Sequence, residues 1–165
     1  MPGILEASTN VGNGVAEIHV HELGHLVLYV RDVQRSAAFY RDVLGFRQVS
    51  DGGSLGPVAA FSSPRTHHEL LLIEVGPHAA PVPAGRRVGM YHFGLKIGDT
   101  DDELRAAVAV LQANDVTVVG ASDHTVTHSL YILDPDGNEI ELYIDVPGVS
   151  WDASSLMTMP KPLSL

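Results

Sequence analysis

The chain has 165 residues, 45% of them apolar, which is enough to bury one core and too short for several domains. Its formal charge is −10 with only ten Lys and Arg residues, so we expect neither nucleic acid nor an anionic membrane surface as a partner. The chain has no cysteine, no basic residue before Arg31 and no apolar run of membrane-spanning length, which together favour a cytoplasmic protein without disulfides or a secretory signal.

Residues 1–16 have the composition of turns and predict a loose leader without chemistry. The β-branched and apolar residues of 17–30 predict extended structure, after which Asp32 or Ser36 can cap a helix that ends at Gly45. Three short strands separated by glycine and proline turns are predicted next, at residues 46–49, 58–61 and 69–75. The first unit therefore reads as strand, helix and three strands.

A connector rich in proline and glycine, residues 76–89, precedes a second copy of this order. Residues 91–97 predict a strand and residues 100–113 a helix with an acidic first turn. Three more strands are predicted at residues 116–119, 129–133 and 139–144. We therefore expect one domain over residues 17–145, built twice from one unit, followed by a C-terminal tail over residues 146–165.

Each predicted unit opens with a histidine at the head of an apolar strand, His25 in the first and His92 in the second. Side chains alternate between the faces of a strand, so Leu28 packs under the helix while His25 faces the opposite side. In the last strand the same rule places Ile140 under the helix and Glu141 on the histidine side. Two imidazoles and a carboxylate, which suit transition metals, are therefore expected to face one cavity.

Residues 21–25, His-Glu-Leu-Gly-His, also match the H-E-x-x-H pattern of zinc proteases. That chemistry requires a helix, because only then do histidines four residues apart project together. The flanking residues favour a strand, a glycine lies inside the motif, and the third histidine of the metzincins is missing from the sequence. We therefore predict that residues 21–25 are extended and are not a protease site.

Two motifs resemble those of a known family. The run Gly24–Asp32 continues with Ser36-Ala37-Ala38-Phe39-Tyr40 and Val43-Leu44-Gly45-Phe46, and residues 134–142 read Asp-Pro-Asp-Gly-Asn-Glu-Ile-Glu-Leu. They resemble the opening module and closing hairpin of the vicinal oxygen chelate superfamily. This resemblance implies an α+β fold in which two βαβββ modules, residues 22–75 and 90–145, pair into a curved mixed sheet around a metal cavity.

The superfamily includes glyoxalase isomerases, fosfomycin-opening enzymes, extradiol dioxygenases and metal-free drug-binding proteins, so the fold alone does not give the reaction. When the units are superposed on Pro64 and Pro135, Leu70 matches Glu141, whereas a glyoxalase I-like enzyme is expected to carry a fourth ligand there. The expected metal ligands are then His25, His92 and Glu141. Two histidines and one carboxylate leave positions open for substrate and dioxygen, as in non-haem Fe(II) oxygenases.

Other residues resemble the catalytic set of the extradiol dioxygenases. Residues 66–70 resemble their paired-histidine strand, which gives His68 the acid/base role, and alternation predicts that His67 faces away from the cavity. Tyr131 lies ten residues before Glu141, as does the active-site tyrosine of those enzymes relative to its Glu ligand. His124 and His128 resemble the approach to that tyrosine; we assign His124 to the site and leave His128 as the alternative. The remaining histidines are expected at the surface: His19, His21 and His78.

The resemblance implies an Fe(II)-dependent extradiol dioxygenase that opens a catechol-type aromatic diol. His68 would transfer protons, while Tyr131 and His124 would orient the substrate oxygens. Mn(II), Ni(II) or Zn(II) are the alternative metals, and the expected partners are an aromatic substrate, dioxygen and a second copy of the chain in a homodimer. Two other functions stay open: another metal-dependent reaction, such as glyoxalase-like isomerisation or thiol or epoxide transfer, and non-catalytic binding of a small molecule.

Overall fold

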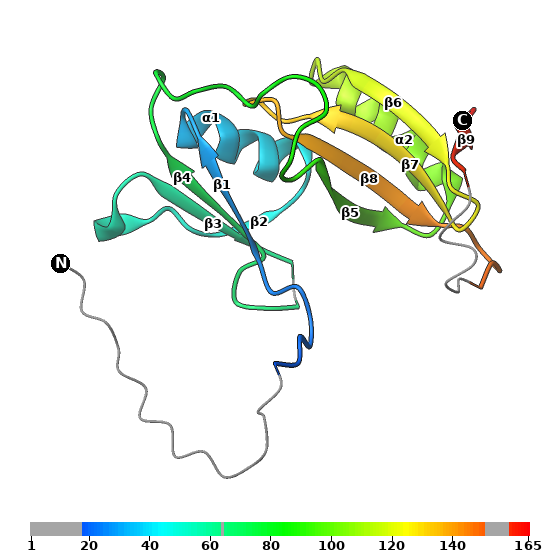
Figure 1. Cartoon of the computed structure of the whole chain (residues 1–165), viewed down its shortest axis with the longest axis horizontal. Helices are drawn as coiled ribbons and strands as arrows, with labels where there is room; N and C mark the ends of the chain where they lie inside the picture. The colour runs from blue at the N-terminus through cyan, green and yellow to red at the C-terminus, as the bar shows by residue number, and fades with distance from the viewer. Residues whose placement is uncertain (1–17, 64, 151–158) are drawn as a thin grey trace, which may run out of the picture.

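The computed structural model describes residues 18–63, 65–150 and 159–165. Figure 1 shows two βαβββ modules beside one another. The elements of the first module are β1 (Leu26–Val30), α1 (Val33–Ala38), the π-helical turn η1 (Phe39–Val43), β2 (Arg47–Ser50), the short turn η2 (Gly53–Leu55), β3 (Val58–Ser62) and β4 (Leu70–Glu74). Those of the second module are β5 (His92–Gly98), α2 (Asp101–Ala113), β6 (Val118–Asp123), β7 (Thr127–Leu133) and β8 (Glu139–Asp145).

Each module forms its own sheet, with strand orders β1-β4-β3-β2 and β5-β8-β7-β6, and the short strand β9 (Lys161–Pro162) extends the second sheet beside β6. In both sheets the first strand pairs in parallel with the last, so the predicted repeat and the α+β class are confirmed. Within the described residues the two sheets share no strand pairing, so a single chain does not form one continuous sheet. Strand β9 (Lys161–Pro162), which the sequence did not predict, pairs with the edge of β6 at Ser122 and Asp123.

The helix of the first module begins where the sequence predicted. Asp32 is its N-cap, and the Asp32 carboxylate accepts a hydrogen bond from the backbone N–H of Arg35 at 3.0 Å. The apolar face of β1 packs under this helix, so Leu28 and Val30 are buried. On the other face Val27 and Tyr29 are 43% and 71% exposed. Alternation therefore separates a core face from an open face, as expected.

The turn between β7 and β8 ties the second module to the helix of the first. The buried hydroxyl of Tyr40 donates a hydrogen bond to Asp134 at 2.9 Å, and Arg31 forms an ion pair with Asp136 at 3.0 Å. Burial, and then the nearby charge of Asp134, raise the pKa of Tyr40 well above its usual range, so the hydroxyl stays a donor. These contacts join residues about a hundred positions apart and fix how the modules sit together.

Residues 21–25 precede β1 and lie in neither a helix nor a strand, so the helix that an H-E-x-x-H site requires is absent there, and the extended structure predicted from residue 17 is a strand only over Leu26–Val30. The leader predicted over residues 1–16 lies outside the described residues, as does the middle of the C-terminal tail. No helix in the described ranges is long and apolar enough to cross a lipid bilayer.

Candidate active site

Four of the predicted site residues meet on the open face of the second sheet. Nε2 of His92, at the start of β5, lies 3.3 Å from Oε2 of Glu141 in β8. Tyr131 in β7 is paired directly opposite Glu141 and its hydroxyl donates a hydrogen bond to Oε1 at 3.3 Å. Nε2 of His124 lies 2.8 Å from the same hydroxyl and 3.8 Å from Glu141. We call these four residues the second half-site: His92, His124, Tyr131 and Glu141.

The environment of Tyr131 keeps its hydroxyl protonated. Burial, followed by the charge of Glu141 and the hydrogen bond to it, raises the pKa of Tyr131 to about 12. Tyr131 is therefore a neutral hydrogen-bond donor at neutral pH, which suits a group that orients an oxygen atom of a substrate.

Two glycines leave space around the second half-site. A Cβ atom at Gly94 would lie 3.3 Å from the ring of Tyr143 and 3.5 Å from Oε2 of Glu141. A Cβ atom at Gly120 would lie 3.3 Å from the ring of Tyr131. Because 3.3 Å is a tight contact for a side-chain carbon, any residue larger than glycine would crowd these groups. Sequence reasoning did not single out either glycine.

His128 lies apart from this group. Its Nδ1 is 2.6 Å from Oδ1 of Asp101, the first residue of α2, and its Nε2 is 3.7 Å from Asp123. The structure therefore brings His124, the assigned residue, beside Tyr131, while His128 ties β7 to the helix.

The first module carries a smaller cluster. His25 directly precedes β1, and its ring centroid lies 4.8 Å from that of His68. Desolvation, followed by the neighbouring imidazoles of His67 and His25, lowers the pKa of His68, so this imidazole is neutral and able to accept a proton at neutral pH. We call His25 and His68 the first half-site.

Strand alternation predicts that His67 faces away from the cavity, but the chain is not a strand at this position. Both His67 and His68 precede the first residue of β4, and their Nδ1 atoms lie 2.5 Å apart. His67 is exposed but contacts His68 instead of pointing to the other face of a strand.

The strand register corrects one step of the sequence argument. His92 is paired with Glu139, so Glu141 lies two residues beyond the partner of the histidine. In the first module Leu26 is paired with Leu70, which makes Leu71 the counterpart of Glu141. Leu70 is 2% exposed and belongs to the core face. Superposing the two units on Pro64 and Pro135 therefore gave a counterpart of Glu141 that is wrong by one residue. The correct counterpart, Leu71, is also a leucine and has no metal-binding atoms.

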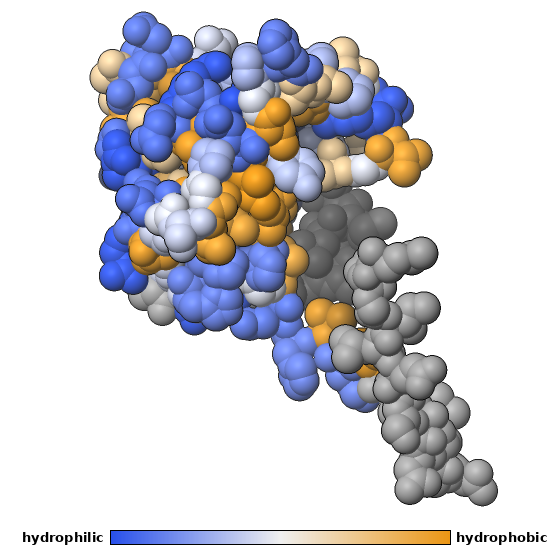
Figure 2. Space-filling model, turned by 90° about the vertical axis from the view of Figure 1, so that its left-hand side faces the viewer, coloured by the Kyte–Doolittle hydropathy of each residue, from blue (hydrophilic) through white to orange (hydrophobic). Residues whose placement is uncertain are grey.

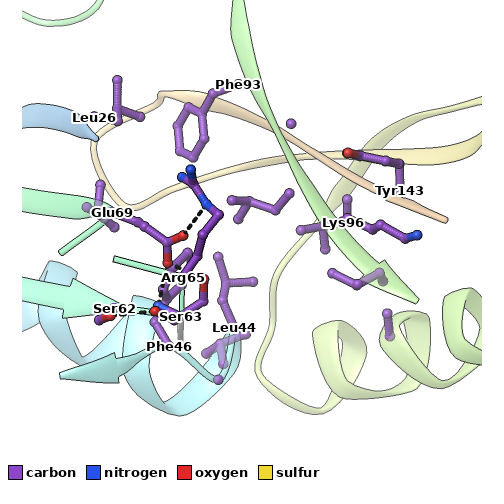
Figure 3. Close-up of a pocket in the computed structure, with 18 of the residues that line it drawn as sticks. Leu26, Leu44, Phe46, Ser62, Ser63, Arg65, Glu69, Phe93, Lys96 and Tyr143 are labelled. Atoms are coloured by element: carbon purple, nitrogen blue, oxygen red, sulfur yellow. Dashed lines mark hydrogen bonds and ion pairs between the residues drawn. The ribbon is translucent and has the colours of Figure 1, made fainter. Parts of the chain in front are cut away.

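A cleft of about 1560 Å³ separates the two modules, and both His25 and His92 line it. Figure 3 shows part of its wall, where Arg65 pairs with Glu69 on the first module and Lys96 and Tyr143 lie on the second. Across the described parts of the chain, no three His, Asp or Glu side chains converge into a group that could hold a metal. The predicted ligand set is thus divided, with His92 and Glu141 together and His25 in the other half-site.

The second half-site has the chemistry of a metal centre. Imidazole nitrogen and carboxylate oxygen bind divalent transition metals at about 2.0–2.2 Å, which puts neighbouring donor atoms about 3 Å apart. The separation of 3.3 Å between His92 and Glu141 fits such a pair. No third His, Asp or Glu of the described residues joins this pair in a metal-binding group, and the sequence predicts His25 as the remaining ligand.

Residues 22–142 match the family described as Glyoxalase/Bleomycin resistance protein/Dioxygenase superfamily. The chain is 34% identical to Catechol-2,3-dioxygenase of Bacillus subtilis (strain 168), over 80% of this chain and 45% of that protein. A crystal structure of a glyoxalase/dioxygenase from Nostoc punctiforme superposes with a TM-score of 0.65 at 24% identity, covering 82% of this chain and 98% of that one. The crystal structure of lactoylglutathione lyase from Agrobacterium tumefaciens superposes with a TM-score of 0.56 at 26% identity, covering 76% of this chain and 94% of that one. The chain spans less than half the length of the first three curated dioxygenases it matches.

Proposed function

The chain belongs to the glyoxalase/bleomycin resistance protein/dioxygenase superfamily, and from this premise we propose that it is an Fe(II)-dependent extradiol dioxygenase acting on a catechol-type aromatic diol. The observation that carries the proposal is the pair His92–Glu141, 3.3 Å apart, with Tyr131 and His124 beside it. The likeness to a catechol 2,3-dioxygenase supports the same reaction, and Leu71 at the counterpart of Glu141 argues against a fourth ligand.

His25, His92 and Glu141 would hold the metal. When bound, Fe(II) supplies open coordination positions at which the two hydroxyl oxygens of a catechol and dioxygen are brought together. Neutral His68 accepts a proton from a catechol hydroxyl, and its lowered pKa keeps it ready to do so at neutral pH. When Glu141 binds the metal, the single hydroxyl proton of Tyr131 would no longer be shared with Glu141 and would be donated to a substrate oxygen, while His124, 2.8 Å away, holds the hydroxyl in place.

A homodimer would unite the two half-sites. Strands β1 and β5 each lie at the edge of their sheet, so the described chain leaves one side of both without a strand partner. Unpaired edges offer backbone groups to another chain, and β1 also exposes Val27 and Tyr29. Figure 2 shows apolar patches among polar residues on the side of the molecule where the first module lies. Pairing β1 of one copy with β5 of another would carry His25 to His92 and Glu141.

The activity is tested by anaerobic reconstitution with Fe(II), followed by oxygen and a panel of catechol, methylcatechols and a biphenyl diol. We expect yellow ring-fission products and uptake of one mole of oxygen per mole of diol, as extradiol cleavage requires. Absence of turnover across the whole panel, with metal bound, would contradict the proposal. The same assay after loading with Ni(II), Mn(II) or Zn(II) tests whether Fe(II) is the metal that supports ring cleavage.

The second candidate is a metal-dependent isomerase or transferase of the same superfamily, which the 26% identity to lactoylglutathione lyase favours. It predicts turnover of a thiol adduct with Ni(II) or Mn(II) and without oxygen. A cytoplasmic location stays a prediction that the cysteine-free sequence supports.

A further inference from the structure

A buried nitrogen of His92 lies close to a buried carboxylate oxygen of Glu139. Nδ1 of His92 and Oε1 of Glu139 are both buried, and neither has a hydrogen-bond partner within the described residues. They lie 3.5 Å apart, because the parallel register pairs the two residues directly across β5 and β8. Buried polar atoms without partners are costly, and a small rotation of the imidazole would bring this pair into hydrogen-bond distance.

Each ring nitrogen of His92 therefore faces its own carboxylate. Nδ1 points to Glu139, whereas Nε2 lies 3.3 Å from Glu141. Tyr91 packs beside the same imidazole, with its ring centroid 4.5 Å from that of His92. Two carboxylates of β8 therefore lie beside different nitrogens of the predicted metal ligand.

We propose that Glu139 is a positioning residue, which accepts a hydrogen bond from the Nδ1–H of His92 and so presents Nε2 as the metal-binding nitrogen. This inference rests on the proposed metal-dependent function. Histidines that bind metals usually donate their other N–H to a carboxylate or carbonyl, which fixes the tautomer and makes the binding nitrogen more basic. Glu141 binds the metal directly, so the two carboxylates of one strand have different tasks.

Metal affinity tests the proposal. Zn(II) is titrated into the full chain against a chromophoric chelator, for the wild type and for Glu139→Ala, Glu139→Gln and Asp145→Asn. Glu139→Ala should raise the dissociation constant by about 10–100-fold, the usual effect of losing such a partner. Glu139→Gln should restore most of the affinity, because the amide oxygen still accepts the Nδ1–H bond.

Asp145→Asn is the matched control. Asp145 lies in the same strand as Glu139, and its side chain forms an ion pair with Lys96 at 2.6 Å and not with a residue of the site. Asp145→Asn therefore removes one negative charge from β8, as Glu139→Gln does. Its affinity for Zn(II) should equal that of the wild type. A loss as large as that of Glu139→Ala would mean that the total charge of the strand matters, and would overturn the positioning role.

The tautomer of His92 gives a readout that needs no metal. Long-range ¹H–¹⁵N NMR of the metal-free protein, with His92 identified from a His92→Gln variant, should show Nδ1–H in the wild type and in Glu139→Gln. Glu139→Ala should show Nε2–H instead, because Glu141 is then the carboxylate that remains beside the ring. If Glu139→Ala left both the tautomer of His92 and the affinity for Zn(II) unchanged, the positioning role of Glu139 would be overturned while the proposed function would stand. A wild type that binds no divalent metal would instead contradict the proposed function, and the NMR result would still decide the role of Glu139.

Discussion

Replacing Glu141 with alanine is expected to weaken Fe(II) binding by more than about 100-fold, beyond the usual effect of an outer-shell partner, and to abolish ring cleavage. Glu141 is the carboxylate that faces both Nε2 of His92 and the hydroxyl of Tyr131. Its removal takes away the negative charge that a divalent cation needs beside the imidazole. Metal content after anaerobic loading and oxygen uptake with catechol measure the two effects.

The same variant has a second consequence that does not depend on metal. The charge of Glu141 helps to raise the pKa of Tyr131 to about 12, so its loss should lower that pKa toward the ordinary value for tyrosine. An ultraviolet pH titration of the metal-free protein, compared with Tyr131→Phe, follows this change. Asp102→Ala, which removes an exposed carboxylate on α2, is the control and should leave both the titration and the metal content unchanged. Full metal binding by Glu141→Ala would remove Glu141 from the ligand set.

Replacing His68 with alanine is expected to preserve metal binding and to slow ring cleavage by about 10²–10⁴-fold, the usual scale of general acid–base catalysis. The reason is that His68 lies in the first half-site beside His25 and is held neutral by its lowered pKa, as a proton acceptor must be. Metal titration and steady-state rates with the best substrate of the panel separate binding from proton transfer.

His78→Ala is the matched control for His68→Ala, because His78 is an exposed histidine of the connector. It should retain the wild-type rate. Loss of metal from His68→Ala would show that His68, and not His25, is a ligand from the first module, and the acid/base role would then have to move to another residue.

The second half-site was predictable because its geometry is local to one sheet. Pairing of Tyr131 with Glu141 follows from the tight turn between β7 and β8, and the alternation of β8 puts Glu141 on the open face. The position of His92 beside this strand follows from the parallel pairing of the first and last strands of the βαβββ module, β5 with β8. Short-range rules of register and alternation therefore explain where His92, Tyr131 and Glu141 lie, whereas Tyr131 and His124 were assigned to the site from the resemblance and not from these rules.

The relation between the half-sites could not be predicted in the same way. Alternation tells which face a side chain takes but gives no distance between two sheets. That distance depends on contacts between remote residues, such as Tyr40 with Asp134 and Arg31 with Asp136. The mismatch at Leu70 and Leu71 has a related cause, because the loop before β4 is longer than the turn before β8, so prolines in the two turns are not equivalent.

We propose that His25 of one copy completes the metal site formed by His92 and Glu141 of another. His25→Ala and Glu141→Ala chains with different tags are co-expressed, and the mixed dimer is purified through both tags. One of its two sites then carries both substitutions and the other carries neither, so we expect about half of the metal content and activity of the wild type, as twofold symmetry requires. A mixed dimer as inactive and metal-free as either parent, or a chain that is monomeric when fully active, would contradict this proposal.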